Sequence, residues 1–140
     1  MGRSTASVCA VFVLLACQSD KPEDQVRQAF EACRRAVEAG DAAAASTPLD
    51  PGFKGPEGMD RATAKLFLLG TLPREKVGVT VLRNEVTVRG NEALQEVDLL
   101  LTERGGGLLP QDASQRGFRL RWRKVGGDWK LLELQSLDGR

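Results

Sequence analysis

The spacing of apolar residues changes once along the chain, and this change limits the folds that the chain can adopt. Between residues 22 and 69 apolar side chains recur every three or four positions, as on one face of a helix. From Val77 to residue 137 they mostly alternate with polar ones, which is typical of strands with one buried face. Helices followed by a run of strands predict an α+β fold, with N-terminal helices packed on an antiparallel sheet of about four strands.

Three helices are expected in the first half. The first covers residues 22–39. Asp41 is placed to cap a short second helix, because its carboxylate can accept a bond from a free backbone amide of the first turn. Residues 48–58 are so rich in Pro and Gly that they predict an irregular loop. A third helix follows over residues 60–69.

The second half predicts an antiparallel meander. Valines occupy odd positions up to Val81 and even positions from Val86, so a bulge or turn is expected near Arg83. The clearest strand is residues 118–123, where apolar side chains alternate with arginines. A Gly-Gly-Asp turn at residues 126–128 then leads into the last strand.

The N-terminus has the pattern of a secretory signal. Residues 1–7 are weakly basic, and residues 8–16 are apolar, uncharged and too short for a spanning helix, which needs about 20 residues. The sequence Leu14-Leu15-Ala16-Cys17 resembles the lipobox of bacterial lipoproteins. The resemblance implies cleavage between Ala16 and Cys17, with diacylglycerol on the Cys17 sulfur and a further acyl chain such as palmitate. The alternative is an ordinary cleaved signal peptide in which Cys17 is incidental.

These observations divide the chain into three parts: a lipoprotein signal peptide at residues 1–16, a lipidated tether at 17–21 and a single α+β domain at 22–138. The lipobox resemblance implies a lipid-anchored protein of the bacterial cell envelope. Gln18, rather than Asp, directly follows the lipidated residue, which resembles the pattern sorted to the outer membrane, facing the periplasm, in a Gram-negative host. Cys33 is then the one free thiol of the mature domain, and its place on an apolar helix face predicts a small core residue.

Composition argues against several classes of site. The chain has no His and no Tyr, and its formal net charge is +1. We therefore expect no metal ion, no cofactor and no nucleic-acid partner. The sharpest charge feature is an arginine stripe on one strand, Arg119, Arg121 and Arg123. It either meets an acidic partner or lipid headgroups, or forms a solvated sheet face paired with Glu96 and Asp98, the interpretation that we favour.

The order of elements resembles the nuclear-transport-factor-two-like superfamily, which has a cystatin-like fold and includes SnoaL-like and ketosteroid-isomerase-like proteins. The resemblance is carried by residues 37–41, 58–61, 118–122 and 127–131. It implies a cone, in which a curved sheet wraps around helices and leaves an apolar pocket. The candidate lining residues are Leu66, Phe67, Phe118, Trp122 and Trp129. Alternatively, these side chains simply fill the core.

The catalytic sets of the enzymes in this superfamily cannot be transferred to this chain. They use an Asp base with a Tyr, or a His–Asp pair, and the chain has neither His nor Tyr. The main hypothesis is therefore a membrane-anchored, non-catalytic domain that binds a small apolar ligand or an envelope protein, with the oligomeric state left open. The alternative is an isomerase- or cyclase-like enzyme that uses a loop carboxylate, Asp50 or Glu57, as its base.

Overall fold

The computed structural model describes residues 21–74, 77–103 and 115–137. The expected signal peptide at 1–16, Cys17 with most of its tether, and the end of the domain at residue 138 lie outside the described residues. Within the described ranges no helix is both long enough and apolar enough to cross a membrane.

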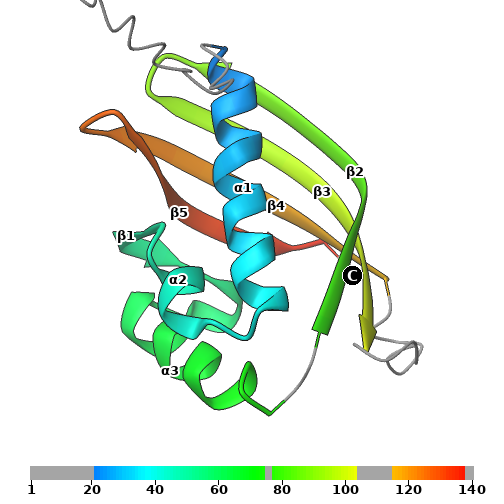
Figure 1. Ribbon diagram of the computed structural model, residues 1–140. Coiled ribbons are helices and arrows are strands. Elements are labelled where there is room, and N and C mark those ends of the chain that lie inside the picture. The colour runs from blue at the N-terminus through cyan, green and yellow to red at the C-terminus, as the bar shows by residue number, and fades with distance from the viewer. Residues whose placement is uncertain (1–20, 75–76, 104–114, 138–140) are drawn as a thin grey trace, which may run out of the picture.

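The architecture is a layer of helices on one face of a curved five-stranded sheet (Figure 1). The helices are α1 (Pro22–Glu38), α2 (Ala42–Ser46) and α3 (Arg61–Thr71), with a 3-10 turn, η1 (Pro56–Gly58). The strands are β1 (Leu49–Lys54), β2 (Val77–Arg89), β3 (Glu92–Glu103), β4 (Gln115–Val125) and β5 (Asp128–Ser136), in the sheet order β1-β5-β4-β3-β2. The predicted α+β fold is confirmed, and the expected bond from the Ala44 amide to Asp41 is present at 3.0 Å.

The prediction of an irregular loop at residues 48–58 was wrong, and the strand found there brings the sheet to five strands. Part of this segment forms β1, an edge strand that pairs in parallel with β5. Local composition argues against a strand here, but an edge strand tolerates proline because one side of it needs no ladder hydrogen bonds. Leu49 and Phe53 are both buried. Burial of these two side chains and pairing with β5 therefore override the Pro and Gly signal.

The other irregularity of the sheet was predicted correctly. The register of the β2–β3 pairing shifts between Val81 and Arg83, which leaves Leu82 as an extra residue, 53% exposed. A one-residue bulge reverses which face later side chains meet. It therefore keeps Val79 and Val81 before the bulge, and Val86 after it, packed against the same core.

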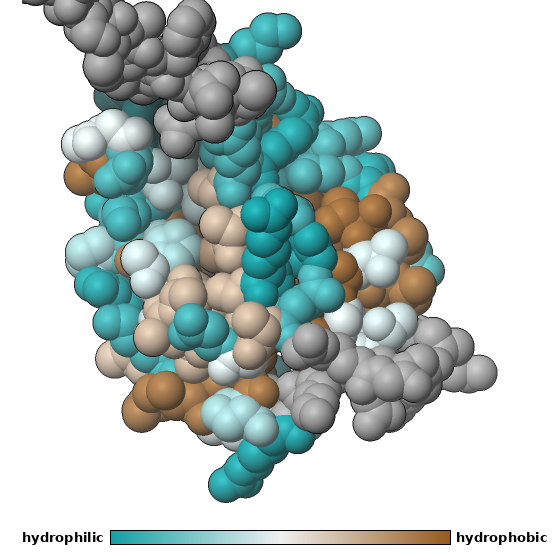
Figure 2. All heavy atoms as spheres, viewed as in Figure 1, coloured by the Kyte–Doolittle hydropathy of each residue, from teal (hydrophilic) through white to brown (hydrophobic). Residues whose placement is uncertain are grey.

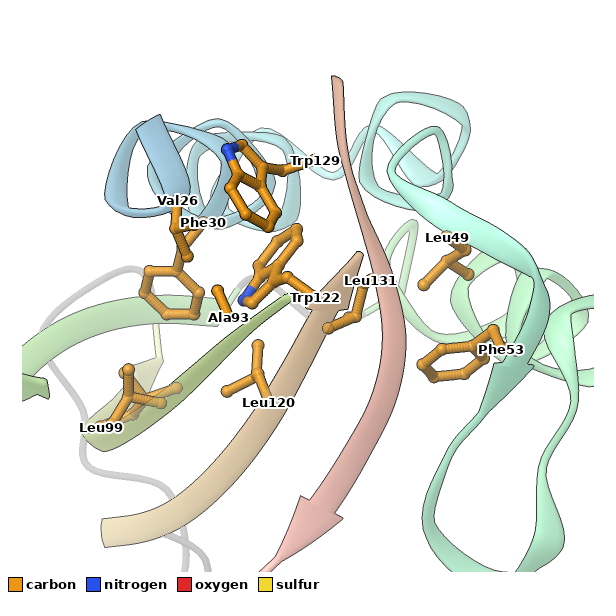
Figure 3. Packing of buried hydrophobic residues seen from close by; sticks show 12 residues of the cluster. Val26, Phe30, Leu49, Phe53, Ala93, Leu99, Leu120, Trp122, Trp129 and Leu131 are labelled. Atoms are coloured by element: carbon orange, nitrogen blue, oxygen red, sulfur yellow. The ribbon is translucent and has the colours of Figure 1, made fainter. Parts of the chain in front are cut away.

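The main core lies between α1 and the concave face of the sheet. Val26 and Phe30 of α1 pack with Leu120 and Trp122 of β4, and Figure 3 shows Trp129 of β5 beside them. Leu49, Phe53 and Leu131 extend this cluster across β5 towards β1. A second, smaller cluster joins the end of α1 to α2 and α3 through Ala36, Ala42, Ala45 and Leu72.

A polar chain crosses the main core. Gln95 is completely buried on the concave face of β3. Its side-chain oxygen accepts a hydrogen bond from the Trp122 indole at 2.9 Å, and its side-chain nitrogen donates to Asn84 at 2.8 Å. Each of these two bonds satisfies a polar group that burial would otherwise leave unpaired, so the chain fixes β2, β3 and β4 relative to one another.

We predict that Gln95→Leu destabilises the domain by about 1–3 kcal/mol, because the buried Trp122 indole nitrogen loses its hydrogen-bond acceptor and the Asn84 oxygen loses a donor. Urea unfolding measures the loss. The matched control is Gln135→Leu on exposed β5 surface, which should change stability by less than about 0.5 kcal/mol. Equal stabilities for the two variants would contradict this account of the core.

Candidate functional site

The domain has a groove of about 600 Å³ that is open to solvent. It lies between α1, the junction of α2 with β1, and the turn that joins β4 to β5. In Figure 2 tan and pale side chains, small or weakly hydropathic, gather beside the teal surface of α1 in this region. The residues that matter most for its shape and chemistry are Gln25, Gln28, Ala29, Ala32, Asp128 and Trp129.

The groove follows from small residues at its two walls. Ala29 and Ala32 leave room along α1, where longer side chains would fill the space. On the opposite wall Gly127 follows Gly126 in a turn in which both residues have positive φ angles, 86° and 58°. Two adjacent residues in that region form the tight hairpin turn whose twist matches the strands. The turn places Trp129, two residues after Gly127, at the wall of the groove.

The polar groups of the groove are mostly neutral donors and acceptors. The Trp129 indole nitrogen donates to the side-chain oxygen of Gln25 at 3.3 Å, and the Lys124 ammonium lies 5.8 Å from the centre of the Trp129 ring. Asp128 and Lys130 add opposite charges at the rim. Within the described residues no group of three or more His, Cys, Asp or Glu side chains is placed to hold a metal ion.

Cys33 also lines the groove but is not an activated thiol. Burial raises the pKa of Cys33 to about 11, and its sulfur lies 3.9 Å from the carbonyl oxygen of Ala45. Only the thiolate is a strong nucleophile, and raising the pKa removes it at neutral pH. The residue therefore contributes volume and packing to the groove.

The two carboxylates of the catalytic alternative lie outside this groove. Burial alone raises the pKa of Asp50, but the Gly52 amide, the Arg123 guanidinium and the charge of Arg61 outweigh it and hold that pKa below its ordinary value. Asp50 is 1% exposed and accepts two bonds from Arg123 at 2.8 and 2.9 Å. Glu57 is exposed on η1. Asp50 is thus held ionised by partners, which suits a structural ion pair better than a catalytic base.

The arginine stripe forms ion pairs across the strands, as the favoured interpretation predicts. Arg119 lies 3.0 Å from Glu96, and Arg121 lies 3.4 Å from Glu133 of β5. Asp98 is held by Arg83 at 2.8 Å rather than by the stripe itself. The stripe is therefore a solvated face neutralised by its own neighbours, with Arg123 reaching Asp50.

The five predicted lining residues do not come together around one cavity. Trp122 and Trp129 are buried in the core and Phe118 packs against it, but only Trp129 borders the groove. Leu66 and Phe67 are 69% and 55% exposed on α3. The expectation that they face inward was wrong, because α3 has a second apolar line and buries that one instead.

Apart from Trp129, the side chains that shape the groove were missed by sequence reasoning. Gln25, Gln28 and Ala32 lie on α1 away from its buried stripe, where polar and small residues are indistinguishable from ordinary surface. The available signal was the run of small residues at 42–46 together with the adjacent glycines at 126 and 127. These features mark a place where helix and turn leave space between them.

Comparison with solved structures shows the fold. A candidate dehydratase of the NTF2-like (nuclear-transport-factor-two-like) family from Streptomyces avermitilis superposes with a TM-score of 0.69 at 19% identity, over 81% of this chain and 92% of that one. A protein of unknown function with a cystatin-like fold from Nostoc punctiforme gives 0.68 at 13% identity, over 81% and 88%. An NTF2-like protein from Cytophaga hutchinsonii gives 0.67 at 13% identity, over 83% and 97%. No family model matches the sequence, and no curated protein sequence matches it significantly.

We predict that Arg123→Met destabilises the domain by about 2–3 kcal/mol at pH 7, because it leaves the Asp50 carboxylate buried without its guanidinium. The control Arg119→Met should cost less than about 1 kcal/mol, since Glu96 stays partly in water. The folded pKa of Asp50 is lowered, so its stabilising ionised form is lost as the pH falls below 3.8. The Arg123→Met deficit should therefore shrink on acidification. Denaturant unfolding between pH 7 and pH 3 measures it, and a constant deficit would contradict the pairing.

Proposed function

We propose that this protein is a lipoprotein of the bacterial cell envelope, tethered through Cys17, whose NTF2-like domain binds a segment of a partner protein and catalyses no reaction. The observation that carries the tether is the sequence Leu14-Leu15-Ala16-Cys17 at the end of an apolar run. The polar residues 18–21 that follow suit a chain leaving a membrane surface. Gln18 favours the outer membrane, facing the periplasm, in a Gram-negative host.

Several acyl chains on one residue explain why such a tether would be stable. A single chain gives only marginal and reversible membrane binding, whereas two or more hold a protein at the bilayer. Helix α1 begins at Pro22, five residues after Cys17, so the proposed tether is short and holds the domain at the membrane surface. Its partners are then confined to the envelope.

The groove beside α1 is the binding site that we propose. Pockets for small apolar ligands enclose most of the ligand surface in apolar walls. This groove is open, and amides and charges share its lining with alanines and Trp129. An extended or helical protein segment suits it better, because the Gln25 and Gln28 amides can bond a backbone while the alanines let that backbone approach closely.

The first test is the intact mass of the protein purified from membranes of a bacterial host, beside a Cys17→Ala variant. A chain that starts at Cys17 and carries the mass of the lipid, with no lipid in the variant, is the expected result. Cleavage at another residue, or an unlipidated Cys17, would rule out the tether.

A second test places a photo-crosslinking amino acid in the groove at Ala32, with Ala39 as the control. Both alanines are exposed at or near the C-terminal half of α1, but only Ala32 lines the groove. We expect one defined adduct in cells from position 32, and we expect Ala32→Arg, but not Ala39→Arg, to abolish binding of the partner identified in that adduct. Equal adducts from both positions would exclude the groove as the site.

A further inference from the structure

The exposed face of α3 carries no charged side chain. Six of its residues are exposed and none is charged: Ala62, Thr63, Leu66, Phe67, Leu69 and Gly70. Three are large and apolar, with 69% of Leu66, 55% of Phe67 and 59% of Leu69 exposed. Figure 2 shows them as a brown patch at the lower left, over α3. We refer to these six residues as the α3 face.

The opposite side of the helix explains why this face stays uncovered. Ala64 and Leu72 are buried, and Leu68 between them packs against the cluster that joins α1 and α2. These three positions are spaced by four and form one line along the helix. Helix α3 therefore carries two apolar lines, and its packing against the rest of the domain buries only one of them.

One charge of α3 lies at the margin of this face. Lys65 is half-buried and borders the same hollow as Leu69. From Arg61 to Thr71 the helix has no Asp or Glu; its nearest acid is the N-cap Asp60. An uncharged apolar face with a basic side chain at its edge is the pattern of a helix that lies in a membrane interface, where long basic side chains reach the headgroups.

The size of the patch argues against a stable protein interface. Three side chains of this size and exposure present roughly 400 Å², about half of the roughly 800 Å² that each partner of a stable complex buries. A bilayer needs no complementary shape, and a domain already tethered to it requires only a weak second contact.

We propose that the α3 face is a second membrane contact, which inserts Leu66 and Phe67 among the lipids of an anionic bilayer while Lys65 meets the phosphates. The proposal rests on the lipid anchor proposed above, which brings the domain to the bilayer. The tether from Cys17 to Lys21 reaches at most roughly 17 Å, and α1 is roughly 25 Å long. Because α3 packs near the far end of α1, the contact lays α1 down towards the membrane plane (Figure 1).

The experiment uses the lipidated protein purified from membranes and reconstituted in phosphatidylcholine vesicles, with or without phosphatidylglycerol, that contain brominated lipid. Bromine quenches tryptophan only at short range. Both native tryptophans are buried, so the parent protein supplies the baseline. Phe67→Trp reports on the α3 face. Leu82→Trp is the matched control, because Leu82 is 53% exposed but lies at the β2 bulge.

The added tryptophan of Phe67→Trp should lose fluorescence intensity to bromine and shift to the blue in the anionic vesicles. The added tryptophan of Leu82→Trp should keep its fluorescence intensity. Lys65→Glu or high salt should weaken the quenching, whereas Arg89→Glu on β2 should leave it unchanged. Equal quenching at positions 67 and 82 would overturn the proposal. So would a blue shift of Phe67→Trp in detergent with a doubled hydrodynamic mass, which would assign the face to a second copy of the chain.

Failure of the anchor is seen separately. Intact mass on the same sample reports lipidation directly. If the exported protein carries no lipid, the anchor is wrong, and flotation of that protein with anionic vesicles, against its Phe67→Ser variant, still tests the α3 face. Flotation that Phe67→Ser abolishes would support the membrane contact, and flotation that it leaves unchanged would refute it.

Discussion

The structure depends on how the concave face of the sheet is covered. The amphipathic helix α1 covers most of this face, because its side chains Val26 and Phe30 pack in the core around Trp122. The same helix holds the sheet's free edge: Arg34, flanked by Glu31 and Glu38, donates to the backbone carbonyl of Val79 on β2 at 3.2 Å. A row of unpaired backbone groups at an edge invites pairing with other chains, and a bulky charged contact there opposes it. With α1 so placed, α2 and α3 are left to pack at its C-terminal end, and the groove opens along its other side.

The two faces of the sheet are stabilised by different physics. The concave face excludes water and satisfies its few polar groups internally, through Gln95 and its two partners. The convex face is a set of cross-strand ion pairs, most of them partly in water and individually weak. Asp50 is the exception, since it is buried and held by a half-exposed arginine. Such a pair stabilises little in itself, but losing one member leaves a buried charge behind. It therefore holds β1 in a single position more than it adds stability.

Much of this fold could be predicted from the sequence, because the spacing of apolar residues indicates which face of a helix or strand is buried. The first helix, the Asp41 cap, the phase change in β2 and the inward side of β4 all follow from spacing alone. β1 could not be predicted, because its strand character comes from pairing with a segment near the C-terminus rather than from Leu49 to Lys54 themselves. α3 failed for a different reason. Its sequence has apolar residues on two sides of the helix. Which side is buried depends on the shape of the neighbouring elements, and the structure buries the side of Ala64 and leaves the side of Phe67 exposed. The groove is a space between elements that are far apart in the sequence, so its only signal is indirect: the small residues at 42–46 and the adjacent glycines at 126 and 127.

The parallel pairing of β1 with β5 has a consequence for the order of folding. Its partners, such as Leu49 and Leu131, lie far apart in the sequence, and contacts of this kind carry a large loop-closure cost. The β2–β5 meander can form from neighbouring hairpins. β1 cannot pair until β5 has been synthesised, and α3, which packs against β1, cannot reach its final position before then. A domain completed only by its final residues stays unfinished during synthesis.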